Sequence, residues 1–159
     1  MIKVGDRIPS ATLREKTAEG IKPVTTDELF KGKKVALFAL PGAFTPTCSA
    51  KHVPSFVSNY DALKGKGISE IVCVSVNDAF VMEAWGKDQK AEGKVRMLAD
   101  GNAEFSDALG LSFDASGFGM GKRSQRYAMV VDDGVVTTLN VEKPGAFEVS
   151  SGEAVLQAL

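Results

Sequence analysis

Residues 34–48 read KVALFALPGAFTPTC, and this stretch determines how the rest of the chain is interpreted. Its first half, Lys34 to Leu40, is an apolar run that stops at Pro41, which predicts a strand buried on both faces. In its second half, Pro46 suits the opening of a helix, because its missing N–H would have no partner there. The stretch therefore predicts a buried strand that leads through a short loop into a helix, with Cys48 in the first helical turn.

A second apolar run, Glu70 to Val76, predicts another central strand. Between the two strands, apolar residues recur at steps of three and four until Gly65 and Gly67 end the pattern. The apolar residues of this predicted helical face are Val53, Phe56, Val57, Tyr60 and Leu63. A strand, a helix and a second strand in this order predict a parallel pair of strands.

Helices and strands are predicted to alternate further along the chain. A helix is predicted from Asp78, whose side chain can cap it, to the region of Gly93. A short strand at Val95–Leu98 and a short helix at Ala103–Leu109, closed by Gly110, come next. The apolar face predicted for the helix that starts at Asp78 consists of Phe80, Val81, Ala84 and Trp85.

The sequence pattern of the last part of the chain predicts an antiparallel hairpin followed by a helix. Tyr127–Val131 and Val135–Leu139 flank Asp132-Asp133-Gly134, where Asp-Gly favours a tight turn. A final helix is predicted at Ser151–Leu159. Together these elements predict an α/β chain with a thioredoxin-like fold, in which helices flank a mixed central sheet, as a single domain over residues 1–159.

Length and composition exclude several classes of protein. The chain has 159 residues, 44% of them hydrophobic, and its 19 Lys+Arg nearly balance its 20 Asp+Glu, as in an ordinary soluble domain. Because it lacks a basic block and a long apolar run, neither a nucleic-acid partner nor membrane insertion is expected. The first residues, Met1 to Asp6, contain no apolar signal core, so a cytoplasmic location is expected.

The chain has few of the residues that form disulfides or bind metals. Cys48 and Cys73 are its only cysteines and His52 is its only histidine. Two cysteines cannot form a disulfide framework, and with one histidine they cannot complete a structural zinc site. We therefore expect reduced thiols and no metal or other cofactor.

Cys48 is the candidate for chemistry, because reactive groups collect where a strand ends and a helix begins. In a first helical turn, unpaired backbone N–H groups and the helix dipole favour the thiolate, which is a nucleophile. The simpler interpretation is that Cys48 is a small buried apolar residue, the usual role of a free cysteine. Its position between strand and helix favours the reactive interpretation.

A Pro-x-x-x-Thr-x-x-Cys pattern at Pro41–Cys48 is followed at long range by Arg126. With these residues the chain resembles the peroxiredoxins, and among them the type II, peroxiredoxin-5-like branch. The other segments that carry the resemblance, which spans most of the chain, are Ile71–Phe80, Trp85-Gly86, Ala91–Asp100 and Arg126–Val131.

The resemblance implies a thiol-dependent peroxidase that reduces hydrogen peroxide and alkyl hydroperoxides through a sulfenic acid. It implies that Cys48 is the peroxidatic cysteine and that Thr45 supplies the hydroxyl that contacts peroxide. The resemblance further implies that Pro41 shields the thiolate and that Arg126 places a guanidinium beside it. Such a cation suits the reaction, because negative charge builds on the leaving oxygen.

The resemblance also implies partners: a thiol reductant, glutathione with glutaredoxin or thioredoxin, and a second copy in a homodimer with Phe44 near the interface. Certain relatives carry a resolving cysteine where this chain has Gly145–Ser151, and no cysteine stands there. Cys73 lies in a predicted buried strand, where a packing role is expected. An internal two-cysteine cycle is therefore not expected, and a Cys48–Cys73 bond formed after local unfolding is the alternative.

Taken singly, the matched residues have simpler interpretations: Thr45 as a helix cap, Pro41 as the end of a strand and Arg126 as a solvated strand residue. His52, one helical turn beyond Cys48, suggests a Cys/His protease, but no orienting partner is evident, and a structural role or at most a place in the pocket wall is expected. Two further functions stay open: a peroxide-sensing thiol protein that relays oxidation to a partner, and a binding module without catalysis.

Two other features are expected to play no part in chemistry. The glycines at 117, 119 and 121 do not have the spacing of a phosphate-binding loop, and a mobile loop is predicted there. Phe80, Met82 and Trp85 are predicted to pack in the core rather than against a cofactor.

Overall fold

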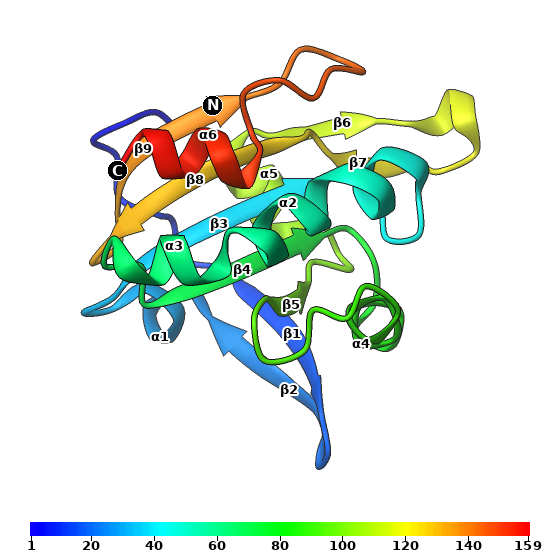
Figure 1. Ribbon diagram of the computed structural model, residues 1–159. Coiled ribbons are helices and arrows are strands. Elements are labelled where there is room, and N and C mark those ends of the chain that lie inside the picture. Colours follow the sequence, from blue (N-terminus) through cyan, green and yellow to red (C-terminus); the bar gives the residue numbers. More distant parts are fainter.

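A mixed sheet of seven strands, in the order β2-β1-β5-β4-β3-β8-β9, forms the centre of the computed structural model, which describes residues 1–159 (Figure 1). The strands of this sheet are β1 (Thr12–Thr17), β2 (Gly20–Thr25), β3 (Lys34–Leu40), β4 (Glu70–Ser75), β5 (Arg96–Ala99), β8 (Tyr127–Asp132) and β9 (Val135–Val141). A separate antiparallel ribbon pairs β6 (Ser112–Asp114) with β7 (Lys122–Ser124).

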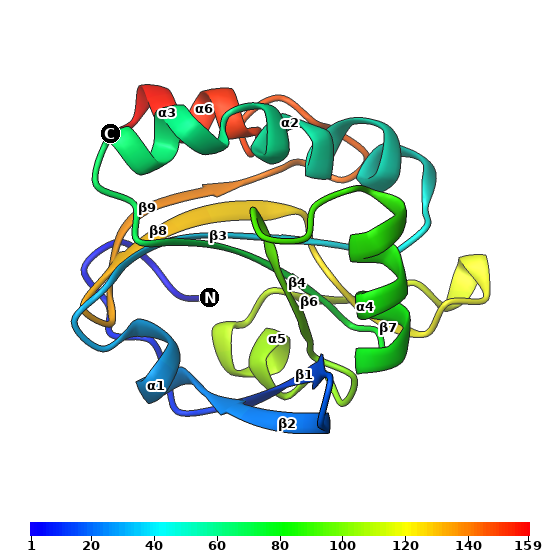
Figure 2. The same cartoon turned by 60° about the horizontal axis from the view of Figure 1, so that its bottom comes forward.

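Helices cover both faces of the sheet (Figure 2). The helical segments are α1 (Thr26–Phe30), a π-helical turn (Cys48–His52), α2 (Val53–Ser58), α3 (Tyr60–Gly65), α4 (Ala79–Asp88), α5 (Glu104–Leu109), a 3₁₀ turn (Ser116–Phe118) and α6 (Gly152–Gln157). Helices α2, α3, α4 and α6 pack on one face, and α1 and α5 pack on the other. This arrangement is the predicted thioredoxin-like α/β fold.

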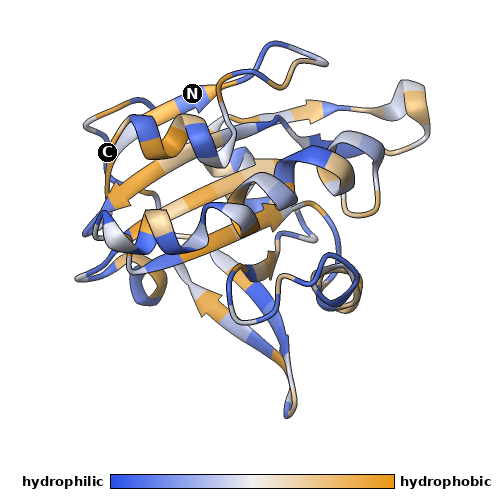
Figure 3. Ribbon diagram, in the orientation of Figure 1, coloured by the Kyte–Doolittle hydropathy of each residue, from blue (hydrophilic) through white to orange (hydrophobic).

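The central strands are buried because their side chains are apolar on both faces, as the colouring of β3, β4 and β8 in Figure 3 shows. Strand β3 pairs in parallel with β4 and antiparallel with β8, so the predicted parallel pair is confirmed. Phe38 on β3 stacks on Phe56 of α2 with ring centroids 4.0 Å apart. Burying a side chain of this size stabilises the fold by roughly 1.5–3 kcal/mol.

The predicted hairpin and the helix caps are present. Strands β8 and β9 are antiparallel around a turn in which Asp133 and Gly134 both have positive φ, as a tight primed turn requires. Asp78 accepts a hydrogen bond from the N–H of Val81 and so caps α4, and Gly110 ends α5 in the left-handed conformation.

The helix predicted between β3 and β4 is interrupted at Asn59. Its backbone leaves the helical region, with φ −101° and ψ 12°, so α2 ends at Ser58 and α3 begins at Tyr60. The Asn59 side chain donates to the carbonyl oxygen of Ser55 at 2.7 Å. A local side-chain bond of this kind competes with the helical backbone pattern.

The apolar face predicted for α4 is right for Trp85 and wrong for Phe80 and Ala84. Phe80 is 63% exposed and Ala84 is also exposed, whereas Ala79, Met82 and Trp85 are buried. The helix turns this second set toward the sheet, where its Gly86 lies against Met97 of β5. The helix also ends at Asp88, before Gly93. The predicted core positions of Met82 and Trp85 are confirmed, and that of Phe80 is not.

Two paired regions were not predicted. Strands β1 and β2 form an exposed, charged edge in which Leu13 and Val24 are the buried residues, so their apolar signal is weak. The glycines at 117, 119 and 121, predicted to lie in a mobile loop, lie in the connection between β6 and β7, which contains the 3₁₀ turn, and the pairing of these two strands was not predicted.

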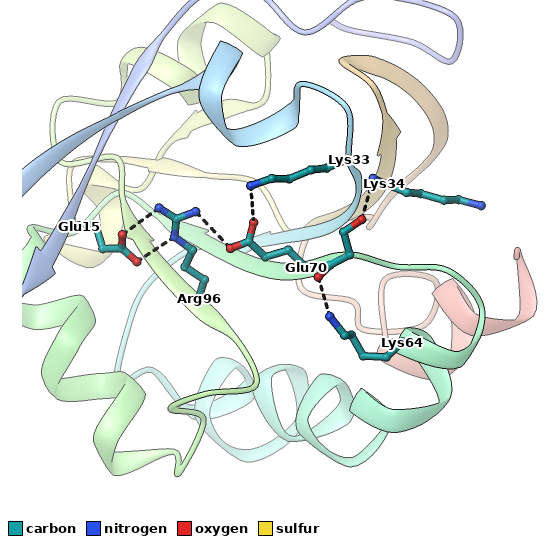
Figure 4. A network of polar contacts seen from close by, with 7 residues as sticks. Glu15, Lys33, Lys34, Lys64, Glu70 and Arg96 are labelled. Carbon is teal, nitrogen blue, oxygen red and sulfur yellow. Dashed lines mark hydrogen bonds and ion pairs between the residues drawn. The ribbon is translucent and has the colours of Figure 1, made fainter.

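An ion-pair network joins the amino ends of β4 and β5 to β1 (Figure 4). Arg96 donates to both carboxylate oxygens of Glu15, each at 2.9 Å, and to Glu70 at 3.1 Å. Lys33 lies 3.6 Å from the other oxygen of Glu70. The charge of Arg96 is thus compensated by two carboxylates. None of the helices is both long and apolar enough to cross a membrane.

Candidate active site

Two hydrogen bonds hold the loop after β3 in a defined shape. The N–H of Ala43 donates to Oδ1 of Asn77, which follows β4, at 2.9 Å. The hydroxyl of Thr45 donates to the carbonyl of Gly42 at 2.7 Å. Because this bond uses the hydroxyl proton, the lone pairs of Thr45 Oγ1 are left to accept a hydrogen bond from a bound molecule.

Cys48 lies in the first turn of the helix that begins at Pro46, as predicted, and its side chain is buried. The backbone N–H groups of Thr47 and Cys48 donate to no group of the protein. The N–H of Val53 bonds to the carbonyl of Cys48, five residues back, so the turn is π-helical. Such turns are frequent at functional sites, and the free N–H groups favour negative charge near Cys48.

Arg126 directs its guanidinium at the sulfur of Cys48. It directly precedes β8, whose first residue, Tyr127, pairs with Ala39 near the end of β3. Nη2 of Arg126 donates to Cys48 Sγ at 3.1 Å. No carboxylate lies within ion-pair distance of Arg126. Its positive charge is therefore free to stabilise a thiolate at Cys48.

His52 holds the other side of that guanidinium. Nη1 of Arg126 lies 2.8 Å from Nδ1 of His52, and Nε2 of His52 lies 2.9 Å from the carbonyl oxygen of Ser150. Arginine can only donate and a carbonyl can only accept, so the imidazole is neutral with its proton on Nε2. Burial, helped by the charge of Arg126, lowers the pKa of His52 to about 3.

The structure therefore gives His52 a role beyond the structural one that was expected. Its orienting partner, Ser150, lies 98 residues away in the chain and cannot be seen in the local sequence. The spacing of four residues between Cys48 and His52 was the available signal, because it places both side chains on one helix face.

Pro41 and Thr45 lie at the same end of β3, next to Arg123 of the β6–β7 ribbon. Arg123 donates to the carbonyls of Met120 at 2.9 Å and of Pro41 at 3.4 Å. A Cβ placed on Gly42 would lie 3.1 Å from this guanidinium and 3.2 Å from the Thr45 methyl group, so glycine permits the close approach.

Cys73 lies on β4, opposite Phe38 of β3, and is fully buried. Burial raises the pKa of the Cys73 thiol well above its ordinary value, and the nearby Cys48 acts in the same direction. Both cysteines are free thiols. A protonated thiol is a poor nucleophile, which is consistent with the packing role expected of Cys73.

The whole site is thus built from side chains and free backbone N–H groups around one sulfur. No group of three or more His, Cys, Asp or Glu side chains could hold a metal ion. What the arrangement offers is a buried nucleophile, a guanidinium that carries no compensating carboxylate and a hydroxyl with free lone pairs.

Comparison with known proteins agrees with this arrangement. The family model described as Redoxin matches residues 3–156. Peroxiredoxin-2E of Arabidopsis thaliana, a chloroplastic protein, is 53% identical over 162 residues, which cover 99% of this chain and 69% of that protein. This chain is a peroxiredoxin. It belongs to the type II, peroxiredoxin-5-like branch of the family and is a thiol-dependent peroxidase.

Solved peroxiredoxins also match the whole chain. Reduced Prx3 of Vibrio vulnificus in complex with hydrogen peroxide is 57% identical, with a TM-score of 0.96 and 99% of each chain covered. Peroxiredoxin 5 of Alvinella pompejana is 40% identical, with a TM-score of 0.87, 99% of this chain covered and 97% of that chain. The peroxiredoxin fold thus extends over this chain from end to end.

Proposed function

We propose that this peroxiredoxin reduces hydrogen peroxide and small alkyl hydroperoxides through a sulfenic acid on Cys48, and that an external thiol reductant regenerates the enzyme. The observation that carries this proposal is the 3.1 Å hydrogen bond from Arg126 to the sulfur of the buried Cys48. A cation without a carboxylate partner at this distance favours the nucleophilic form of the thiol.

In the first step the Cys48 thiolate attacks one oxygen of the peroxide. The Sγ–O bond forms while the O–O bond breaks, and the other oxygen leaves as hydroxide or alkoxide, which takes up a proton to become water or an alcohol. Sulfur is oxidised by two electrons and the peroxide is reduced by two.

Three neighbours assist this step. The guanidinium of Arg126 can bond both sulfur and peroxide oxygen as charge moves between them. Thr45 Oγ1, whose proton is bonded to Gly42, can accept the O–H of the peroxide. Pro41 has no N–H and limits access of water at the end of β3.

In the second step a thiol of the reductant attacks the sulfenic acid, which gives a mixed disulfide and water. A second thiol then releases Cys48 as the reduced form. We propose glutathione with glutaredoxin, or thioredoxin, as the reductant. The absence of a cysteine in Gly145–Ser151 and the buried, protonated state of Cys73 support an external thiol rather than an internal one.

We also propose a homodimer in a cytoplasmic setting. Phe44 is 53% exposed beside Trp85, with ring centroids 6.4 Å apart, which supports an apolar contact surface next to the Cys48 turn. Two free thiols suit a reducing compartment. Sedimentation and cell fractionation test these two assignments.

The test of the peroxidase cycle is a steady-state assay with hydrogen peroxide, run with each reductant in turn. Many turnovers with at least one reductant are expected, whereas one turnover per chain would indicate a sensor. In parallel, one equivalent of peroxide is added with dimedone, which traps sulfenic acids, and the peptides are mapped. A trapped Cys48 with free Cys73 is expected, and a predominant Cys48–Cys73 disulfide would contradict the external-thiol cycle.

A further inference from the structure

Glu142, directly after β9, is a buried carboxylate that the peroxidase cycle described above does not use. The residue is 7% exposed. Its Oε2 atom accepts four hydrogen bonds, from the N–H groups of Glu148, Val149 and Ser150 at 2.8, 2.8 and 2.9 Å and from the Ser150 hydroxyl at 2.7 Å. One oxygen therefore fixes three consecutive residues, which we call the 148–150 strap.

Glu142 also bonds to Arg126. The backbone N–H of Glu142 donates to the carbonyl oxygen of Arg126 at 2.9 Å. The carboxylate that holds the strap and the arginine that faces Cys48 are thus fixed to each other through the backbone. Burial alone would raise the pKa of Glu142, but the hydrogen bonds from Ser150, Val149 and Glu148 outweigh it and lower the pKa. The side chain is therefore ionised at neutral pH.

The strap in turn holds His52. Both the N–H and the hydroxyl of Ser150 are bound to Glu142, which orients the Ser150 carbonyl toward Nε2 of His52. Phe147, next to the strap, packs on His52 with ring centroids 5.0 Å apart and lies 6.0 Å from the Arg126 guanidinium carbon. Every link from Glu142 to Cys48 is a hydrogen bond of 3.1 Å or less.

We propose that Glu142 is a positioning residue for the peroxide step. By holding the 148–150 strap, it keeps the proton of His52 on Nε2, so that Nδ1 accepts from Arg126 and the guanidinium is aimed at Cys48. This inference rests on the proposed function, in which Arg126 assists attack by Cys48. The hydrogen bond that one ring nitrogen of a histidine makes, here to the Ser150 carbonyl, determines which nitrogen carries the proton.

The test replaces the carboxylate with an amide of the same shape. Glu142→Gln weakens the four hydrogen bonds, and Glu148→Gln makes the same chemical change on the exposed side chain of the strap. The second-order rate constant with hydrogen peroxide, measured by stopped flow, is expected to fall about tenfold or more in Glu142→Gln, as for other groups that orient a reacting residue. No change is expected in Glu148→Gln.

A second readout separates positioning from a general loss of structure. His52 is the only histidine, so protein labelled with ¹⁵N-histidine gives the signals of one imidazole. The wild type is expected to show a single neutral tautomer with the proton on Nε2. In Glu142→Gln the signals are expected to shift toward a mixture of tautomers. The ring is expected to stay neutral, because the Glu142 charge and the bond to Ser150 both raise the pKa of His52 and their loss removes that effect.

A slower peroxide step together with altered His52 signals supports the proposal. An unchanged rate, or a slower step with unchanged His52 signals, overturns it. If Glu142→Gln does not fold, Ser150→Ala is used in the same way, because it removes one of the four bonds and keeps the carbonyl that binds His52. A wild-type protein that does not react with peroxide would contradict the proposed function, while the His52 signals would still test the tautomer that Glu142 fixes.

Discussion

Two half-buried arginines at opposite ends of the same sheet are used in opposite ways. Arg96, at the amino ends of the parallel strands, donates to two carboxylates, and its charge is compensated (Figure 4). Arg126, near the carboxyl end of β3, donates to a neutral imidazole and to a sulfur. The first arrangement ties strands together, and the second keeps a positive charge available for a thiolate.

The partners of each arginine thus determine what its charge does. A carboxylate beside Arg126 would compensate the charge that the proposed Cys48 thiolate uses, whereas a neutral histidine orients the guanidinium and leaves its charge uncompensated. Keeping His52 neutral therefore matters as much as placing Arg126, and burial achieves it.

The largest effect on the rate constant with hydrogen peroxide is expected from Arg126→Met. Removal of the guanidinium takes away a donor to the sulfur and to the leaving oxygen, and the rate constant with hydrogen peroxide is expected to fall about 10²–10³-fold. Stopped-flow mixing of reduced protein with peroxide measures it. Arg126→Lys is expected to lose most of the rate as well, because a point charge cannot contact both atoms as the fork does. A full rate in either variant would mean that Arg126 has been assigned the wrong role.

The neutral state of His52 predicts a pH dependence of stability. Its pKa is about 3 in the folded protein, because of burial and then Arg126, and about 6.5 in the unfolded chain. Between these values the unfolded chain binds the extra proton, so the stability that depends on neutral His52 is complete above pH 6.5 and is lost as pH falls toward 3. Each unit by which the pH falls within this window lowers the free energy of unfolding by about 1.4 kcal/mol.

Urea unfolding at pH 7 and pH 5 tests this dependence. Between pH 7 and pH 5, the free energy of unfolding of the wild type is expected to fall by about 2 kcal/mol more than that of His52→Gln, because glutamine cannot take up a proton. The other charged or titratable groups that face His52 are Arg126 and Glu142, with Cys48 beyond Arg126, and all three are present in both proteins. Equal losses in the two proteins would show that His52 does not stay neutral through burial.

A smaller effect is expected from Thr45→Val, which keeps the shape of the side chain and removes the hydroxyl. The peroxide rate constant is expected to fall about tenfold, the cost of a typical hydrogen bond to the reacting molecule. Alkylation of Cys48 by iodoacetamide, which needs no such contact, is expected to continue. If both reactions slow equally, Thr45 acts on the loop rather than on the peroxide.

The smallest effect on the peroxide rate is expected from Arg96→Met. The side chains of Arg96, Glu15 and Glu70 in the network of Figure 4 are 23–28% exposed. Because Arg96 binds both oxygens of Glu15 within a network of charges, its loss is expected to lower the free energy of unfolding by more than the ~1 kcal/mol of an isolated surface pair, while the peroxide rate stays unchanged. A large loss of rate would remove the contrast between the two arginines.

The sequence predicted those parts of the fold that depend on runs of apolar residues. Strands β3, β4, β8 and β9 were found because burial on the sheet demands apolar side chains, and the Asp133-Gly134 turn because few residues adopt positive φ. The edge strand β2 and its neighbour β1 were missed because both are short of apolar residues and β1 carries three charged side chains. Phe80 was misplaced because apolar spacing alone did not fix which side of α4 faces the sheet.

The site was predictable only in part for a related reason. Cys48 lies at a strand–helix junction that can be recognised locally, and the family pattern connected it to Arg126. The links from Glu142 through Ser150 to His52 join segments far apart in the chain, without periodicity or a local motif. Such tertiary hydrogen bonds become visible only when the fold places their partners together.

The central claim is that the uncompensated charge of Arg126 is held for the sulfur of Cys48. Thiolate absorbance at 240 nm tests it most directly, at neutral pH and in a Cys73→Ser background so that one thiol remains. The absorbance is expected to fall in Arg126→Met and to stay unchanged in Arg96→Met. Equal absorbance in the two variants would contradict the claim.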